Sequence, residues 1–439
     1  MPVSAPGIHV APAQPRTDNA ENLALARSPG LLVVFTGGRA AAIPLPIESG
    51  VIEIGRDHPA LSSLTDPCLS RHHLLVRYDG RFVVTDLGSR NGTTVDGVPV
   101  PPRTPREVTR VIRAGTTLLV PVQNIAPLVN HGVEIVGQRV VGPTQRATRL
   151  LVEHAASLER TLHLLGESGT GKEALARAYH AAGPTPGAPF RALRCAGIPA
   201  GAVEQVLFGS APGSDGGTLY LDGVAALSMS VQARLLHLLE HGEVFPLGAT
   251  RPEKVDLRIC FVARRDLRDQ VDAGRLSESL YFRLAETRVL VPALRSRLEE
   301  VSYLLQMEVA RVSGLPIHAS LVEACLRQVW PGNVRELLAE ASNAAHAAVA
   351  AGAAAVDVRH LHAVAGSALE AGRSSPVPSS STRSTSASQM RERVVTALES
   401  CAGNVSAAAR ELGVHRTQLR RWLDRYDIEP RTFGPGDEK

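Results

Sequence analysis

Short apolar runs separated by turn residues fill the first third of the chain. These runs are Leu31–Phe35, Val51–Ile54, Leu74–Tyr78 and Phe82–Asp86. The pairs Asp79-Gly80 and Asn91-Gly92 favour turns between runs of this kind. Strands of this length, recurring at this spacing, predict an all-β sandwich over residues 30–128.

Strands and helices alternate between residues 140 and 366. The predicted strands are Leu162–Leu165, Thr218–Leu221 and Arg258–Ala263, and helices are predicted after Lys172 and through Gln232–Leu239. This order predicts an α/β domain in which crossover helices connect the strands of a parallel sheet. The Ala-rich stretch Ala341–Val356 is expected to be a helix, and it is too short to span a bilayer.

Three further segments complete the chain. Arg373–Ser388 consists mainly of Ser, Thr and Pro, which predicts a solvated linker over residues 367–389. The tail, residues 390–431, has the pattern of an all-α helix-turn-helix. Residues 1–29 lack the basic start and apolar run of a signal peptide, and we expect them to be disordered.

Composition narrows the class of protein. A chain of 439 residues is long enough for about three domains. Its net charge of +4 is mild, so any contact with nucleic acid should come from a local basic patch. The five cysteines lie far apart and lack metal-ligand spacing, which indicates reduced thiols in a cytoplasmic protein. No membrane partner is expected.

A phosphate-binding loop follows the predicted strand Leu162–Leu165. Its residues are Gly166, Glu167, Ser168, Gly169, Thr170, Gly171, Lys172 and Glu173. The glycines let backbone N–H groups approach phosphate, the following helix adds positive potential, and Lys172 supplies a charge. Asp222 ends the next apolar strand and is the candidate Mg²⁺ ligand. ATP or ADP with Mg²⁺ is therefore the expected cofactor.

Five more stretches make residues 140–366 resemble the AAA+ ATPase domain of the bacterial enhancer-binding activators of sigma-54 RNA polymerase. They are Leu207–Gly209, Val255–Ile259, Leu280–Leu284, Val291–Arg297 and Trp330–Leu337. The resemblance implies a small helical subdomain and a homo-oligomer. It also implies that Arg335 reaches the nucleotide's phosphates, and that Arg283 is a possible arginine finger.

Four departures from that family concern its catalytic apparatus. Gly223 stands where the family carries the water-polarising glutamate, Arg264 where it has a γ-phosphate-sensing asparagine, and Ser277 where it has a first arginine finger. Only Ser210–Asp215 separate Gly209 from Gly216, where relatives insert the GAFTGA hairpin that touches sigma-54. We therefore expect ATP binding with weak or absent hydrolysis, and contact with sigma-54 is doubtful.

Three arginine-bearing motifs make the first domain resemble a forkhead-associated (FHA) domain. They are Gly55-Arg56, Ser70–His73 and Ser89–Thr93. Arginines held on loops suit recognition of a phosphate dianion through charge-assisted hydrogen bonds. The resemblance implies a phosphothreonine site in which Arg56 and Ser70 contact phosphate, supported by Arg71, Arg90 and Asn91.

The tail resembles the Fis-type helix-turn-helix that ends the same activators. A helix, a turn at Gly413 and a second helix can bury one shared apolar face, formed by Ala408, Leu412, Val414, Leu419, Trp422 and Leu423. Double-stranded DNA is the expected partner, bound by a dimer. Residues expected at base edges are His415, Arg416, Thr417 and Gln418, and Arg420 and Arg421 are expected mostly at phosphates.

Three interpretations remain open from these residues. The leading one is a transcriptional regulator that couples phosphothreonine recognition to DNA binding through a hydrolysis-defective AAA+ domain. The second is an active sigma-54-dependent ATPase activator, and the third is a phosphopeptide adaptor whose helix-turn-helix serves only dimerisation. The phosphothreonine can belong to another protein or, after a Ser/Thr kinase acts, to Thr382 or Thr385 of the linker.

Overall fold

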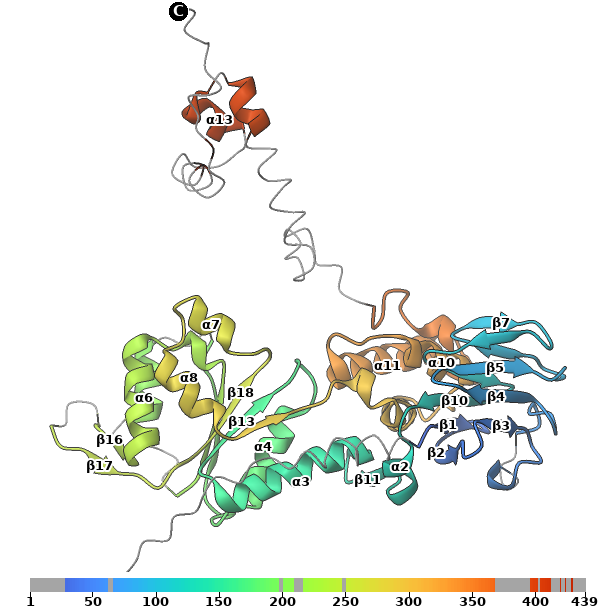
Figure 1. Ribbon diagram of the computed structural model, residues 1–439. Coiled ribbons are helices and arrows are strands. Elements are labelled where there is room, and N and C mark those ends of the chain that lie inside the picture. Colours follow the sequence, from blue (N-terminus) through green and yellow to red (C-terminus); the bar gives the residue numbers. More distant parts are fainter. Residues whose placement is uncertain are drawn as a thin grey trace, which may run out of the picture. The chain divides into compact units, whose positions relative to one another are not determined.

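The computed structural model describes residues 28–61, 66–196, 200–208, 216–246, 250–367, 395–401 and 403–411, together with positions 419, 423 and 428 (Figure 1). The chain divides into two compact units, Met1–Ala368 and Leu369–Lys439. Each unit is described by itself below. Within the described part of the chain, no helix is long and apolar enough to cross a membrane.

The first domain is the predicted β-sandwich. Its strands are β1 (Gly30–Thr36), β2 (Arg39–Pro46), β3 (Val51–Ile54), β4 (Leu74–Tyr78), β5 (Phe82–Asp86), β6 (Thr93–Val95), β7 (Val98–Val100), β8 (Pro105–Glu107), β9 (Ile112–Ala114) and β10 (Thr117–Val122), with a 3-10 turn at Pro59–Leu61. They form two antiparallel sheets, ordered β2-β1-β10-β9-β6-β7 and β3-β4-β5-β8. Side chains that alternate along the strands, among them Leu31, Val33 and Val76, fill the space between the sheets.

The central domain contains a five-stranded parallel sheet, ordered β14-β15-β18-β13-β19. Its strands are β13 (Thr161–Leu165), β14 (Phe190–Arg194), β15 (Thr218–Asp222), β18 (Arg258–Ala263) and β19 (Arg288–Leu290). Helices α3 (Pro143–Leu158) and α4 (Lys172–Ala181) pack on one face. On the other face lie α5 (Ala200–Phe208), α6 (Met229–His241) and α8 (Glu278–Ala285). The predicted strands and crossover helices are confirmed.

Smaller elements connect and extend these domains. They are α2 (Ala126–Asn130), the hairpin β11 (Glu134–Val136) and β12 (Arg139–Val141), a 3-10 turn at Val224–Ala226, the hairpin β16 (Glu243–Val244) and β17 (Glu253–Lys254), and α7 (Arg268–Asp272). The hairpin β11–β12 directly precedes α3 and brings Val140 and Val141 to the edge of the cavity described below.

A helical subdomain follows β19. It consists of 3-10 turns at Leu294–Ser296, Leu298–Glu300 and Val358–His360, and helices α9 (Val301–Val312), α10 (Ala319–Arg327) and α11 (Asn333–Ala350). The predicted Ala-rich helix is the second half of α11, which ends at Ala350 rather than Val356. Gly352 follows with a φ of 62°, a backbone conformation that terminates a helix at low cost.

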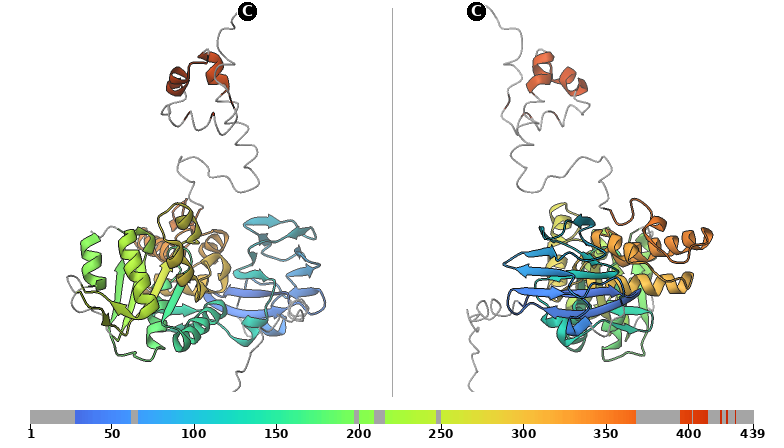
Figure 2. Two further views of the ribbon diagram at one scale, coloured as in Figure 1. Left: turned by 60° about the vertical axis from the view of Figure 1, so that its left-hand side comes forward. Right: turned by 90° about the vertical axis from the view of Figure 1, so that its right-hand side faces the viewer.

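The helical subdomain and the β-sandwich lie side by side (Figures 1 and 2) and share one hydrophobic core. Leu32, Val34 and Phe35 of β1 point away from the interior of the sandwich and pack in the same cluster as Leu305 of α9 and Trp330. Strand β1 is therefore buried on both faces, which explains its continuous apolar sequence.

Polar contacts border this shared core. The Glu323 carboxylate of α10 accepts hydrogen bonds from Arg113 Nη1 and Thr94 Oγ1, each at 2.8 Å. Gln306 Oε1 of α9 accepts from the backbone N–H of Ala40 at 2.7 Å. The sequence did not predict that these two domains are joined in this way.

The second unit has a small helical core. Residues 395–400 and α13 (Val405–Glu411) are helical. Its buried side chains are Ala397, Leu398, Ala408, Ala409, Leu419, Leu423 and Ile428. The predicted burial of Ala408, Leu419 and Leu423 is confirmed, and Leu412, Val414 and Trp422 lie outside the described residues.

Candidate nucleotide and phosphothreonine sites

The phosphate-binding loop joins β13 to α4. Gly169 and Gly171 have φ values of 76° and 97°, a left-handed conformation that glycine adopts most easily. A Cβ at Gly169 would lie 1.9 Å from the carbonyl oxygen of Gly332, so the helical subdomain closes directly over the loop. Only glycine fits this position.

Lys172, the first residue of α4, folds back over the loop. Its Nζ donates to the carbonyl oxygens of Gly166 at 2.6 Å and Glu167 at 2.7 Å. The pKa of Lys172 is lowered to about 8, mainly by burial and additionally by the charges of Arg264 and Arg335, whereas the charge of Asp222 acts to raise it. A phosphate group at this position would favour the protonated amine.

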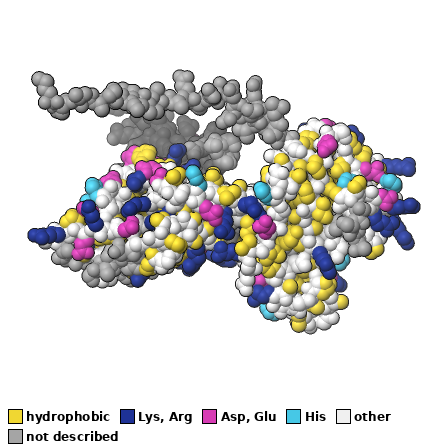
Figure 3. Space-filling model, turned by 90° about the horizontal axis from the view of Figure 1, so that it is seen from below, with side chains coloured by type: hydrophobic (Ala, Val, Ile, Leu, Met, Phe, Trp, Pro, Cys, Tyr) yellow, Lys and Arg dark blue, Asp and Glu magenta, His cyan; other side chains and the backbone are white. Residues whose placement is uncertain are grey.

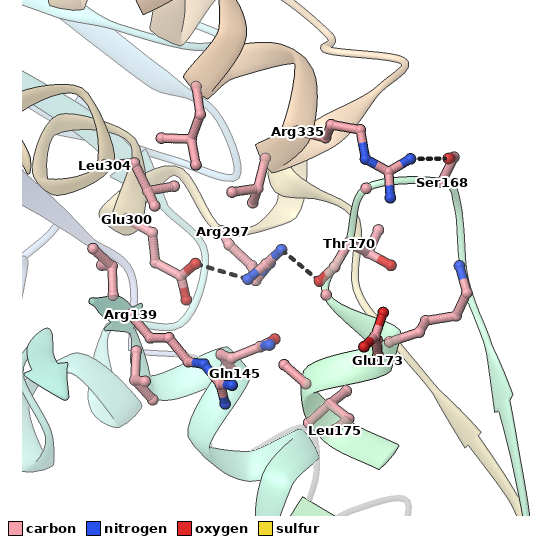
Figure 4. Close-up of a pocket in the computed structure, with 18 of the residues that line it drawn as sticks. Arg139, Gln145, Ser168, Thr170, Glu173, Leu175, Arg297, Glu300, Leu304 and Arg335 are labelled. Carbon is pink, nitrogen blue, oxygen red and sulfur yellow. Dashed lines mark hydrogen bonds and ion pairs between the residues drawn. The ribbon is translucent and has the colours of Figure 1, made fainter. Parts of the chain in front are cut away.

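The start of α11 holds the loop from above. The Asn333 side chain is fully buried and donates to Glu167 Oε2 and to the Ser168 carbonyl oxygen, both at 3.0 Å. Its Oδ1 accepts from the backbone N–H of Leu294 at 2.7 Å. Arg335 Nη1 donates to Ser168 Oγ at 3.2 Å (Figure 4). The sequence predicted Arg335 in this place but missed Asn333, although Asn333 lies in the same quoted motif.

A cavity of about 700 Å³ opens beside the loop (Figure 4). Its apolar lining is formed by Val140, Val141, Leu175, Leu304, Met307 and Leu338. The polar lining contains most of the predicted nucleotide residues: Ser168, Gly169, Thr170, Gly171, Lys172, Glu173, Asp222 and Arg335. Gly166 and Glu167 do not line it. Glu167 is instead bound by both Nη atoms of Arg295, which holds the pKa of Glu167 below its ordinary value.

A buried ion pair supports the middle of the cavity, and sequence reasoning missed it. Arg297 and Glu300 are 2% and 1% exposed, and Arg297 Nη1 lies 2.7 Å from Glu300 Oε2. Glu300 Oε1 accepts from the backbone N–H of Gly142 at 2.9 Å, and Arg297 Nη2 donates to the Thr170 carbonyl oxygen at 3.5 Å. Burial raises the pKa of Glu300 to about 7 despite Arg297. The pair connects the start of α9 to α3 and to the phosphate loop.

Gly223 follows Asp222 at the carboxyl end of β15. Its φ is 81°, and no neighbouring heavy atom lies within 4 Å of a Cβ built at this position. A side chain would therefore have room, but the backbone conformation would strain it by about 1 to 3 kcal/mol. No carboxylate stands at the position where a water-polarising glutamate was expected.

The two positions of the expected arginine fingers have partners within the chain. Ser277 caps α8, since its Oγ accepts from the backbone N–H of Leu280 at 3.3 Å. Arg283 pairs with Glu286 and donates to the Leu239 carbonyl oxygen at 3.3 Å. Arg283 does not line the cavity of its own chain.

In the sandwich, backbone and histidine hydrogen bonds tie the three arginine-bearing loops together. The Arg56 N–H donates to the Ser70 carbonyl oxygen at 2.9 Å, and the Arg90 N–H donates to Ser70 Oγ at 3.1 Å. The buried His73 accepts from the Ser70 N–H at Nδ1 and reaches the Gly92 carbonyl oxygen with Nε2, both at 3.1 Å. Burial lowers the pKa of His73, so a neutral ring with its proton on Nε2 satisfies both bonds.

These loops present their charges outward. Arg56, Arg71 and Arg90 are exposed, and within the described ranges none of them has a carboxylate within 4 Å. Asn91 Nδ2 donates to the Cys68 carbonyl oxygen at 2.8 Å. A Cβ at Gly55 would lie 1.8 Å from the Arg71 carbonyl oxygen, so this glycine permits the close approach of two loops. Basic side chains project from the sandwich end of the surface in Figure 3.

Other predicted features lie outside the described residues. These are His415, Arg416, Thr417, Gln418, Arg420 and Arg421 of the tail, Ser210–Asp215, and Thr382 and Thr385 of the linker.

Three family models match the chain. The sigma-54 interaction domain matches residues 141–290, the FHA domain residues 52–115, and the bacterial regulatory protein Fis family residues 391–426. The transcriptional regulatory protein FlbD of Caulobacter vibrioides is 30% identical over 360 residues, covering 73% of this chain and 78% of FlbD. The chain belongs to the sigma-54 activator family.

Two other regulatory proteins match over smaller shares of their own length. The hydrogenase transcriptional regulatory protein HoxA of Bradyrhizobium diazoefficiens is 33% identical over 67% of this chain and 66% of HoxA. The acetoin catabolism regulatory protein of Cupriavidus necator is 36% identical over 64% of this chain and 46% of that protein. The chain thus spans less than two thirds of either relative. Among solved structures, NtrX from Brucella abortus in complex with ATP matches at 26% identity with a TM-score of 0.46, covering 66% of this chain and 69% of NtrX.

Proposed function

We propose that this member of the sigma-54 activator family is a DNA-binding transcriptional regulator. It recognises phosphothreonine through its FHA domain and binds ATP with little or no hydrolysis. The observation that carries the proposal is Gly223, which follows Asp222 in a left-handed conformation and leaves the cavity without a catalytic carboxylate.

Nucleotide binding is supported by the cavity itself. Its apolar lining suits a purine base, and its polar lining offers loop N–H groups, Lys172 and Arg335 to phosphates. The Asp222 carboxylate has no ion-pair or hydrogen-bond partner in the described ranges, which suits a Mg²⁺ ligand. Asp222 is the residue that would hold Mg²⁺, which would supply positive charge next to the phosphates. Glu173 is engaged with Arg177 at 2.9 Å.

Weak hydrolysis follows from what the side chains can do to water. A general base contributes about 100- to 10,000-fold to such a reaction. Asp222 is the candidate ligand for the metal, Glu300 is paired with Arg297, and Gly223 carries no side chain. Water beside the terminal phosphate would therefore have no positioned carboxylate to accept its proton.

Phosphothreonine binding is supported by the three tied loops. Because Ser70 Oγ already accepts from the Arg90 N–H, its own hydroxyl hydrogen remains available for a phosphate oxygen. Arg56, Arg71 and Arg90 surround this hydroxyl on the same loops and can supply charge-assisted hydrogen bonds. The partner is a phosphothreonine protein or the chain's own linker, phosphorylated by a Ser/Thr kinase.

DNA binding is supported by the match of residues 391–426 to the Fis family and by the helical core of the second unit. His415, Arg416, Thr417 and Gln418 are proposed at base edges, with Arg420 and Arg421 at phosphates. A dimer or higher homo-oligomer is proposed because a domain this small gains specificity by pairing.

The proposal is tested by measuring ATP binding and ATP hydrolysis on one preparation of the full chain. We expect saturable binding that Lys172→Ala abolishes, with turnover near the background of that variant. Robust hydrolysis by the wild-type chain that disappears in Lys172→Ala would refute the hydrolysis defect.

A second candidate function is that of an active sigma-54-dependent activator. The match to the sigma-54 interaction domain and the identity to FlbD favour it. ATP-dependent open-complex formation by sigma-54 polymerase, measured with and without the protein, distinguishes the two candidates.

A further inference from the structure

The phosphate end of the nucleotide cavity carries an excess of positive charge. The cationic side chains there are Lys172, Arg194, Arg264 and Arg335. A second hollow of about 790 Å³ adjoins this end and shares Arg194, Asp222 and Arg264 with it. Two arginines that the phosphate-loop motif does not include, Arg194 and Arg264, therefore line the region where the two hollows meet, next to Asp222.

Most other charges around the cavity are already paired. Arg297 pairs with Glu300, Arg149 with Glu153, Glu173 with Arg177, Glu167 with Arg295 and Asp266 with Arg288. By contrast, Lys172, Arg194, Arg264 and Arg335 have no carboxylate within 4 Å in the described ranges. Asp222 is the one carboxylate of the lining without an ion-pair partner in those ranges. Together with Arg139, which also lines the cavity and has no ion-pair partner in those ranges, five cations thus face a single unpaired carboxylate.

The pKa of Lys172 is consistent with this imbalance. Arg264 and Arg335 both lower it, so these cations are close enough to repel one another. A bound polyphosphate would turn this repulsion into attraction. In an ordinary phosphate-loop site, much of the negative charge of the phosphates is neutralised by Mg²⁺, which is held by one or two carboxylates and the phosphates.

We propose that Arg264 and Arg194 supply enough positive charge at the terminal phosphate that this site, although Asp222 can hold Mg²⁺, does not require the metal to bind a nucleoside triphosphate. The proposal deepens the proposed function, since it rests on ATP binding at the same cavity. A guanidinium fork forms two parallel hydrogen bonds to phosphate oxygens and keeps its charge at any physiological pH. Unlike a metal ion, it cannot bind and activate water. The two arginines therefore account for retention of ATP, whereas its slow cleavage follows from the missing carboxylate at Gly223.

Selectivity for the triphosphate follows from the positions of the residues. Lys172 and the loop N–H groups surround the inner phosphates, whereas Arg264 and Arg194 lie at the outer end, where the two hollows meet. ADP would leave both arginines without a partner. We expect the chain to bind ATP at least about tenfold more tightly than ADP, the scale of one charge-assisted hydrogen bond.

The test compares the Kd of the full chain for ATP by calorimetry in excess Mg²⁺ and in excess EDTA. The wild-type Kd should differ between the two media by less than about threefold, well under one charge-assisted bond. Arg264→Asn should raise the Kd in EDTA by about tenfold or more and should make binding depend on Mg²⁺. Arg191→Asn is the matched control, because Arg191 lies on the same strand as Arg194 but lines neither hollow.

Each outcome decides a different claim. If EDTA abolishes ATP binding while Mg²⁺ restores it, the metal-free site is refuted and nucleotide binding stands. If Arg264→Asn binds in EDTA as well as wild type does, Arg264 is not the neutralising group and the proposal is again refuted. If the wild-type chain binds no nucleotide in either medium, ATP binding itself is refuted. Thermal unfolding of each variant, compared with wild type, confirms that Arg264→Asn remains folded.

Discussion

Because the sandwich and the helical subdomain share one core, we predict that the two domains unfold cooperatively. Leu118 of β10 is fully buried and packs in the same hydrophobic cluster as Trp330, which lies more than 200 residues later. Leu118→Ala deletes side-chain atoms from this cluster and leaves a cavity. A buried Leu→Ala change costs about 2 to 5 kcal/mol, and we take about 3 kcal/mol for this site.

Trp330 fluorescence reports the consequence. The chain has two tryptophans, so a Trp422→Phe background assigns the emission to Trp330, which is 1% exposed. With a urea m-value of about 3 kcal/mol/M, a loss of about 3 kcal/mol lowers the midpoint of unfolding by about 1 M. We expect the Trp330 transition to move by this amount, although the substitution lies in the other domain.

The control is the same substitution on the surface. Leu150 of α3 is 59% exposed, and Leu150→Ala should leave the Trp330 midpoint within experimental error. If Leu118→Ala leaves the midpoint of the Trp330 transition unchanged, the two domains unfold independently. The continuous core would then contribute nothing to the stability of the helical subdomain.

Three further outcomes follow from the sites. The affinity for ATP should be constant between about pH 7 and pH 8, above the second ionisation of the terminal phosphate, and should fall as Lys172 loses its proton above its pKa of about 8. Lys172→Arg should remove this fall, and unchanged wild-type affinity up to about pH 9.5 would contradict the low pKa. Gly223→Glu alone should not restore ATP hydrolysis. It should also lower the free energy of unfolding by about 1 to 3 kcal/mol, because φ is 81° at this position. Turnover comparable to that of an active relative would show that Arg264 does not prevent hydrolysis. Arg56→Ala should weaken binding of a phosphothreonine peptide to the full chain by about tenfold or more. The control is Arg81→Ala, a substitution away from the three loops. Equal peptide affinity of the two variants would exclude Arg56 from the site.

Local sequence predicted the elements of the fold well. The four sandwich strands and the three parallel strands that were predicted from apolar runs lie within one residue of the expected bounds, because each is a short apolar run bounded by turn residues. Strands β2, β14 and β19 were not predicted. The phosphate loop was equally readable, since its glycines and Lys172 act within eight positions. The continuous run Leu31–Phe35 predicted a strand but not that Leu32 and Phe35 would pack against helices.

Long-range contacts were not readable. Asn333 binds a loop 165 positions earlier, and Arg297 reaches Thr170 across 127 positions. Nothing in the local sequence around Asn333 or Arg297 indicates a contact with the phosphate loop. Glu323 is similar: an acidic residue in a helix favours a solvated face, and only the fold shows that Arg113 and Thr94 neutralise and cover it.

The packing of β1 against α9 restricts how the helical subdomain can move relative to the sandwich. Asn333 and Arg335 of the helical subdomain form hydrogen bonds to the phosphate loop. The same subdomain packs against β1 and β10 of the sandwich. A rotation of that subdomain away from β1 would expose this apolar surface to water unless the sandwich moved with it. We therefore expect the loops that bear Arg56 and Ser70 to move as one body with the helices that contact the phosphate loop.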